Sequence, residues 1–281
     1  MNSKPASNTQ TSNTAATTHS GAAPANNTPI LEVKGLTKQY DDEAGNAVIL
    51  KDLNLSIDKK EFLCILGPSG CGKTTFLRCV AGFESYEGEI LVKGRRISGP
   101  GTDRIMVFQD FNQLFPWKTV EKNIQYPLKI RGIKDKNELK RLSDEALEKV
   151  RLSGYGSYYP HQLSGGMKQR VAIAKALILK PEIILMDEPF AALDAMTRRD
   201  LQNEVIRICA DADSTIIFIT HNIQEALILS SRVLVFSKDG HIIVDDPNEL
   251  EQPVTPSTPG YGQVWEKLHG ALYSSKEIPS P

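Results

Sequence analysis

Residues 67–74 carry glycine, lysine and threonine at the spacing of a phosphate-binding loop, G-x-x-x-x-G-K-[ST]. The glycines let successive backbone N–H groups turn toward phosphate oxygens, and the start of the following helix adds a partial positive charge. Lys73 is expected to reach the β- and γ-phosphates, and the Thr74 hydroxyl to bind Mg²⁺. The predicted ligand is therefore a nucleoside triphosphate with magnesium. The residues expected to contact it are Gly67, Pro68, Ser69, Gly70, Cys71, Gly72, Lys73, Thr74 and Thr75.

The flanks of this loop agree with the motif. Residues 62–66 are apolar and predict a buried strand that ends at Gly67, and residues 74–80 predict a helix directly after the loop. The alternative is a glycine-rich turn that binds nothing, and the strand and helix on either side disfavour it.

A second motif places two carboxylates after an apolar run. Residues 183–186 predict a buried strand that delivers Asp187 and Glu188 at its carboxyl end, where ligand sites of open α/β sheets lie. Asp187 is expected to hold Mg²⁺, directly or through water, and Glu188 to act as general base for the attacking water. The alternative is a solvated pair of acids, which a phosphate loop in the same chain makes less favoured.

A third motif, residues 163–170, reads Leu-Ser-Gly-Gly-Met-Lys-Gln-Arg. Ser164, Gly165 and Gly166 offer a hydroxyl and backbone amides at the start of a predicted helix, which is anion-binding geometry. Taken alone, these residues are better explained as a helix N-cap in a permissive turn.

Together the three motifs make residues 30–250 resemble the ATP-binding cassette family, the nucleotide-binding subunits of ABC transporters. Residues 163–170 match the family's signature, and their combination with residues 186–189 is highly specific. The resemblance implies an α/β P-loop NTPase fold with a RecA-like parallel-sheet core, an antiparallel β subdomain and a helical subdomain inserted at about residues 110–165. It also implies an ATPase that uses ATP and Mg²⁺.

The family pattern assigns four further positions. Gln109 matches the glutamine that contacts Mg²⁺ and water and senses the membrane partner, and His221 matches the switch histidine near the γ-phosphate. Tyr40 falls where the family stacks an aromatic ring on adenine, and Asp194 where an acid links two nucleotide sites across a dimer. The family more often has Ser at the position of Ala191, which weakens the match around Asp194. Each residue also has an ordinary alternative, as a polar loop residue, a helix-start residue or a cover over a sheet edge.

The resemblance also implies partners. Ser164, Gly165 and Gly166 of one subunit would complete the ATP site of another, which gives a head-to-tail homodimer with two ATPs between the subunits. Phe111, Leu114, Phe115 and Trp117 are expected on a loop that receives a coupling helix of an integral membrane permease, although a loop folded over its own core remains possible. Residues 99–104 and 114–120 are similar to the nitrate/sulfonate/taurine importers. The chain is then expected at the cytoplasmic face of the inner membrane as a peripheral subunit that serves a periplasmic or lipid-anchored solute-binding protein indirectly.

Composition bounds these expectations. The net charge of −1 gives no reason to expect nucleic acid as a partner, and no run approaches the roughly 18 apolar residues that would span a bilayer. Residues 1–29 are almost all small and polar and are expected to be disordered, with a transit peptide as the weaker alternative; residues 251–281 are expected to form a C-terminal extension. A non-transport ABC ATPase of DNA repair or translation is the alternative function, disfavoured because the chain has one cassette and no inserted coiled coil.

The remaining residues predict strands that alternate with helices, which indicates a parallel sheet covered on both faces. Strands are expected at residues 30–34, 48–57, 62–66, 89–92, 104–108, 182–186 and 214–219, with a turn at 41–46 and a final hairpin at 232–244. Helices are expected at residues 74–80, 119–152 with a break at Gly132, 166–179, 195–210 and 223–229, and a short amphipathic piece at about 264–272.

Overall fold

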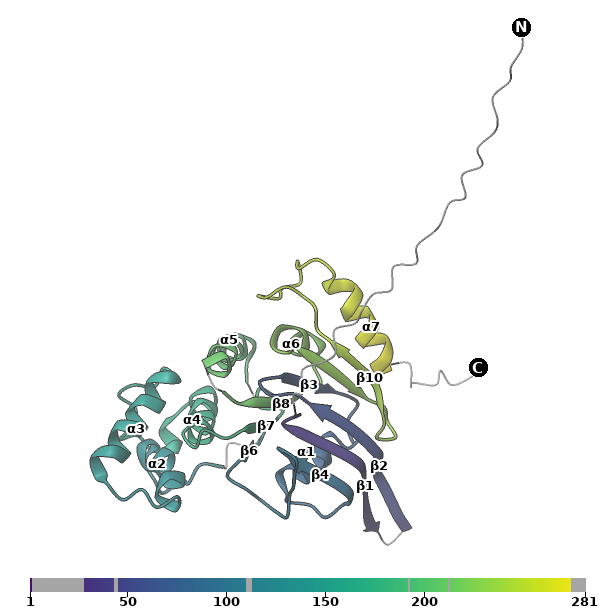
Figure 1. Cartoon of the computed structure of the whole chain (residues 1–281). Coiled ribbons are helices and arrows are strands. Elements are labelled where there is room, and N and C mark those ends of the chain that lie inside the picture. Colours follow the sequence, from purple (N-terminus) through teal and green to yellow (C-terminus); the bar gives the residue numbers. More distant parts are fainter. Residues whose placement is uncertain (2–27, 43–44, 110–112, 192, 212, 274–281) are drawn as a thin grey trace.

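Figure 1 shows the computed structural model, which describes residues 1, 28–42, 45–109, 113–191, 193–211 and 213–273. A six-stranded sheet in the order β10-β9-β3-β8-β7-β6 forms the centre of the molecule. β3, β6, β7, β8 and β9 are parallel, and β10 is antiparallel to β9. These strands are β3 (Phe62–Leu66), β6 (Arg104–Val107), β7 (Ile183–Asp187), β8 (Thr215–Ile219), β9 (Arg232–Phe236) and β10 (Ile242–Pro247).

Both faces of this sheet are buried, because successive side chains of each central strand enter different cores. On β3, Leu63 and Ile65 pack into one hydrophobic cluster, and Cys64 and Leu66 into another. This explains why the central strands are continuous apolar runs, as buried parallel strands are. The predicted doubly covered parallel sheet is confirmed.

A second sheet covers one of these faces. It is antiparallel, in the order β2-β1-β4-β5. Its strands are β1 (Leu31–Asp42), β2 (Gly45–Ile57), β4 (Glu87–Val92) and β5 (Arg95–Arg96). The two strands extend into the turn expected at residues 41–46, because Asp41 pairs with Asn46 and Asp42 with Gly45. The prediction placed the ends of the turn too far apart. Register shifts along β1 break the alternation of side chains, so the sequence pattern does not reveal the full length of the hairpin.

The helices complete the two layers. α1 packs between the sheets, whereas α4, α5 and α6 cover the other face of the central sheet (Figure 1). The region predicted as helical from 119 to 152 divides into α2 and α3, with Gly132 at φ 93° in the turn between them. The helices are α1 (Lys73–Ala81), α2 (Val120–Ile130), α3 (Lys136–Lys149), the 3₁₀ turn η2 (Pro160–Gln162), α4 (Gly165–Leu177), α5 (Ala195–Asp211), α6 (Ile223–Leu229) and α7 (Tyr261–Tyr273).

Candidate functional site

The phosphate loop lies between β3 and α1, as its sequence predicts. Gly72 is the N-cap of α1 at φ 98°, a conformation that side chains other than glycine rarely adopt. A Cβ atom at this position would lie only 2.7 Å from Leu50 Cδ2 and 3.1 Å from the Ile49 carbonyl oxygen. The loop therefore rests on β2 of the antiparallel sheet, and glycine is required by both conformation and space.

Lys73 folds over the loop. Its Nζ donates hydrogen bonds to the carbonyl oxygens of Gly67, at 2.7 Å, and Pro68, at 2.9 Å, and the residue is buried. Cys71 is also buried, with Sγ 3.9 Å from Lys73 Nζ, and burial raises the pKa of its thiol. An ammonium group thus sits inside the loop, where it can exchange carbonyl partners for phosphate oxygens. Ser69 and Gly70 are exposed at the tip.

The structure brings the end of β7 against the start of α1. Thr74 Oγ1 donates a hydrogen bond to Asp187 Oδ1 at 3.1 Å, and burial raises the pKa of the Asp187 carboxyl above its usual value. A hydroxyl and a carboxylate side by side are the hard oxygen donors that Mg²⁺ prefers, and Mg²⁺ commonly takes its remaining positions from water and phosphate. Within the described ranges, no three His, Cys, Asp or Glu side chains converge as a metal cage. The pair therefore suits Mg²⁺ held jointly with a nucleotide.

Glu188 and His221 meet beyond the ends of β7 and β8. Glu188 Oε2 lies 3.0 Å from His221 Nδ1, and the Glu188 backbone N–H donates to the carbonyl oxygen of Ile219. Glu188 has φ 42°, an uncommon value for a residue other than glycine. The two residues predicted to act on the γ-phosphate are thus adjacent, at the same edge of the sheet as Asp187.

The residues of the third motif begin α4. Ser164 is exposed, and its hydroxyl accepts a hydrogen bond from the Met167 N–H at 3.3 Å. Gly166 is buried against Thr197, whose side chain leaves no room for a Cβ. No hydrogen bond between described residues joins Ser164, Gly165 or Gly166 to residues 67–75 of the same chain. One copy of the chain therefore does not connect the two predicted phosphate-binding motifs.

Asp194 lies close to that motif through α5. Its carboxylate accepts hydrogen bonds from the N–H groups of Thr197, at 3.0 Å, and Met196, at 3.1 Å. These hydrogen bonds hold the pKa of Asp194 below its usual value, and the bond from Thr197 contributes most. Since Thr197 also packs on Gly166, Asp194 and the start of α4 form one connected surface.

The two other predicted residues lie on the surface. Gln109 is exposed directly after β6, and Phe111 beyond it lies outside the described residues. Tyr40 is exposed on β1, and the Lys38 ammonium lies 4.4 Å from the centre of its ring. The structure does not bring Tyr40 or Gln109 into hydrogen-bond contact with the phosphate loop.

Sequence reasoning missed two polar residues that support the site. Glu225 is buried on α6, where it accepts hydrogen bonds from Thr220 at 2.5 Å and Gln202 at 3.2 Å, and so fixes the segment before His221. Burial raises the pKa of the Glu225 carboxyl. The second missed residue is Lys38, which lies against the ring of Tyr40. Its position two residues before Tyr40, on the same face of a strand, is the sequence signal that could have identified it.

An apolar cavity of about 430 Å³ lies beside the end of β6, and Phe108, Tyr126, Ile130 and Lys175 contribute to its lining. Phe115 packs against Tyr126, with ring centres 4.7 Å apart, and Trp117 is 71% exposed. Leu114 is buried in the core, so for this residue the alternative of a loop folded over its own core holds.

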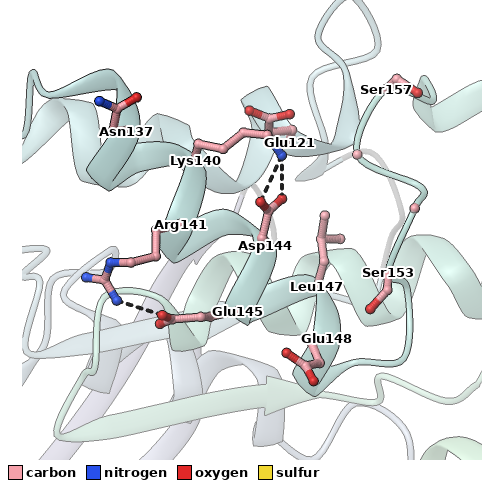
Figure 2. A pocket seen from close by; sticks show the side chains of 12 residues that line it. Glu121, Asn137, Lys140, Arg141, Asp144, Glu145, Leu147, Glu148, Ser153 and Ser157 are labelled. Atoms are coloured by element: carbon pink, nitrogen blue, oxygen red, sulfur yellow. Dashed lines mark hydrogen bonds and ion pairs between the residues drawn. The ribbon is translucent and has the colours of Figure 1, made fainter.

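Another cavity, of about 760 Å³, lies between α3 and residues 153–157 (Figure 2). Its cations are already paired: Lys140 with Asp144, and Arg141 with Glu145. The carboxylates in its lining, Glu121, Asp144, Glu145 and Glu148, outnumber the two cations. A phosphate group would be repelled there, so the candidate nucleotide site remains the loop at residues 67–75.

None of the helices in the described ranges has the length and apolar character needed to cross a membrane.

The chain is similar to known proteins over most of its length. The family described as ABC transporter matches residues 50–191. The aliphatic sulfonates import ATP-binding protein SsuB of Bacillus thuringiensis subsp. konkukian is 39% identical over 249 residues, which cover 86% of this chain and 97% of the relative. The nitrate import ATP-binding protein NrtC of Synechococcus elongatus is 40% identical over 83% of this chain, which corresponds to 36% of that longer protein.

A solved structure has the same fold. It is a dimeric ATP-binding cassette in a post-hydrolysis state, bound to ADP and Pi, with 32% sequence identity and a TM-score of 0.70. The match covers 78% of this chain and 99% of that chain. The chain therefore belongs to the ABC transporter family, and it is an ATP-binding ATPase subunit of that family.

Proposed function

We propose that the chain energises uptake of a small oxyanion, of the sulfonate or nitrate class, through separate permease subunits. The observation that carries the catalytic part is the convergence of Thr74 with Asp187 and of Glu188 with His221 at one edge of the central sheet. The similarity to import subunits supports the direction and the substrate class.

The geometry supports a division of roles around the triphosphate. Residues 67–75 would bind the phosphates through backbone N–H groups and Lys73, with Tyr40 against the base. Thr74 and Asp187 would hold Mg²⁺, with Gln109 as a further ligand after β6. Bound Mg²⁺ would neutralise charge on the β- and γ-phosphates. Glu188 would take the proton of the attacking water, and His221 would orient Glu188 and the γ-phosphate.

A second copy of the chain would complete each site. Ser164, Gly165 and Gly166 form a phosphate-binding surface that their own chain leaves unconnected to the loop, and Asp194 adjoins them through Thr197. A head-to-tail dimer would place this surface on the γ-phosphate of the partner. Loss of that phosphate would then weaken the dimer, because ligand contacts hold its closed state.

The apolar cavity beside the end of β6 would receive a permease helix. Phe108, Tyr126 and Ile130 supply apolar lining, and the exposed Trp117 packs on Phe115, which in turn packs on Tyr126. In this arrangement residues 110–165 act as the helical subdomain of a domain at 30–250, flanked by a tail at 1–29 and an extension at 251–281. The assembly would sit at the cytoplasmic face of the inner membrane and respond there to a solute-binding protein across the membrane.

Two measurements test this proposal. In a nucleotide titration, Asp187→Asn should weaken binding of ATP with Mg²⁺ about tenfold or more and leave binding of ATP with EDTA unchanged. Cells that lack the chain should lose uptake of labelled alkanesulfonate or nitrate, whereas uptake of a labelled sugar serves as the control. Equal loss in both nucleotide titrations would refute the magnesium role, and normal uptake of both oxyanions would refute the substrate class.

A further inference from the structure

Lys38 is a buried cation that lies against the face of Tyr40. Its Nζ is 4.4 Å from the centre of the Tyr40 ring, and the residue is only 7% exposed. An ammonium group at this distance is attracted to the electron-rich face of an aromatic ring, and the attraction grows when water is excluded. The contact therefore ties the Tyr40 ring to a group with little freedom of its own.

The segment after α1 also holds the ammonium group. Glu84 lies 3.4 Å from Lys38 Nζ, and the Ser85 hydroxyl accepts a hydrogen bond from the same atom at 3.4 Å. Glu84 also faces Arg78 on α1, at 3.9 Å. The chain of contacts runs from Tyr40 through Lys38 and Glu84 to the helix that begins at the phosphate loop.

The backbone adds a second connection between Tyr40 and that loop. Lys38 pairs with Leu50 and Gln39 with Val48, so the pairing skips Ile49, which forms a bulge on β2. Ile49 and Leu50 are the residues that lie against Gly72 of the phosphate loop. The strand pair that carries Tyr40 is therefore in contact with the loop at one end of α1 and with Glu84 at the other.

We propose that Lys38 is a positioning residue for the purine base: it holds the Tyr40 ring so that the ring's other face receives the base of the bound nucleoside triphosphate. This rests on the proposed function, in which Tyr40 stacks on the base. A ring that is held before binding loses less conformational entropy when the base arrives. A cation on one face also draws electron density from the ring, which favours a stacked base on the other.

The test compares ATP with inorganic tripolyphosphate, which lacks the base, in titrations of the full chain. Lys38→Met keeps the apolar stem and removes the charge; it should weaken ATP binding about fivefold and leave tripolyphosphate binding unchanged. Lys38→Arg keeps a cation and should restore most of the ATP affinity. Lys34→Met on the same strand is the matched control, since Lys34 is exposed and pairs with Glu32, and it should change neither titration.

A double-variant cycle separates this inference from the role of Tyr40. If Lys38 acts through the ring, Lys38→Met should add nothing to the loss of ATP affinity caused by Tyr40→Ala. Glu84→Gln leaves Lys38 in place but removes the charge that holds its ammonium group, so it should also weaken ATP binding. It is the second variant if Lys38→Met is poorly folded. Equal weakening of both ligands by Lys38→Met, or additive losses in the cycle, would overturn the inference while Tyr40 kept its role. Unchanged ATP affinity in Tyr40→Ala would overturn the stacking role itself.

Discussion

Glu188 Oε2 and His221 Nδ1 lie 3.0 Å apart and join the ends of two adjacent strands, β7 and β8. The contact occurs where the Glu188 backbone has a left-handed φ of 42°, which costs about 1–3 kcal/mol and persists only where surrounding bonds hold it. The hydrogen bond from Glu188 N–H to the Ile219 carbonyl oxygen is one such bond. The fold thus holds the Glu188 carboxylate next to the histidine although the backbone conformation of this residue is unfavourable.

Glu188→Gln should abolish hydrolysis without abolishing binding. The amide cannot take a proton from water, so phosphate release should fall about 100- to 10,000-fold. ATP should still bind, because residues 67–75 and Asp187 are unchanged, and the trapped nucleotide should shift the chain to a dimer in gel filtration. Turnover at the wild-type rate would contradict the role of Glu188, and a monomer with bound ATP would contradict the shared site.

Lys73→Ala should weaken ATP binding about ten- to 100-fold, the effect expected when a charge-assisted hydrogen bond to phosphate is lost. The Lys73 ammonium donates hydrogen bonds to the carbonyl oxygens of Gly67 and Pro68. The variant should therefore also make the loop easier to open. Isothermal titration measures the affinity, and amide hydrogen exchange at residues 67–72 measures the opening. Unchanged affinity would show that Lys73 stays on the carbonyl oxygens when nucleotide binds.

Continuous apolar runs and glycine spacing made the central sheet and the phosphate loop predictable. Residues 183–187 and 215–219 are fully buried strands, and few other structures accommodate such runs between turn signals. The length of the β1–β2 hairpin was not predictable, because bulges such as that at Ile49 shift the alternation of side chains. The sequence also left open which way Leu114 faces, because a leucine beside aromatic residues on a loop can face either the core or a partner, and only packing decides.

In the candidate site, residues that belong to a motif were found from the sequence, whereas residues that act only through contacts outside the motifs were not. Thr74 and Asp187 were both expected near Mg²⁺, and they are in direct contact. Glu225 was missed because its role depends on Thr220 and Gln202, which reach it from two other segments. Hydrophobic periodicity carries no information about such polar pairs.

Trp117→Ala should reduce coupling to the permease and leave the basal ATPase rate intact. The ring is 71% exposed and packs only partly on Phe115, so its loss should cost little stability. Tryptophan is enriched among the interface residues whose truncation costs more than about 1 kcal/mol, and a loss of that size predicts a fivefold or greater loss of permease binding. Co-purification and transport in reconstituted vesicles measure this.

Leu114→Ala is the contrasting variant, because truncation of a buried leucine should cost about 2–5 kcal/mol of stability. Intact transport in Phe115→Ala/Trp117→Ala would exclude the docking role.

Glu225→Gln should remove part of the pH dependence of stability. Burial raises the pKa of Glu225 in the folded protein above its unfolded value, so the folded state binds more protons in the window between the two values. Glu225 therefore makes its full contribution to the free energy of unfolding at pH values below its unfolded pKa. That contribution is lost as pH rises through its folded pKa. Urea unfolding at several pH values should show that, as pH rises, the free energy of unfolding declines less for the variant than for the wild type. Glu249→Gln, at an exposed position, is the control, and identical slopes for Glu225→Gln and wild type would contradict the prediction.

Cys71 should report on opening of the phosphate loop. Its thiol is 1% exposed, and burial raises its pKa, so alkylation should be slow even without nucleotide and should require the loop to open. ATP at 100 times its Kd should slow the reaction about 100-fold further, because it binds only the closed loop. Mass spectrometry of the peptide that contains Cys71 measures the rate, and Cys71→Ser identifies the signal. Cys79, also buried and with its pKa raised to about 12, lies outside the loop and should react at a rate that ATP changes less. Equal labelling of Cys71 with and without ATP would mean that the nucleotide does not close this loop.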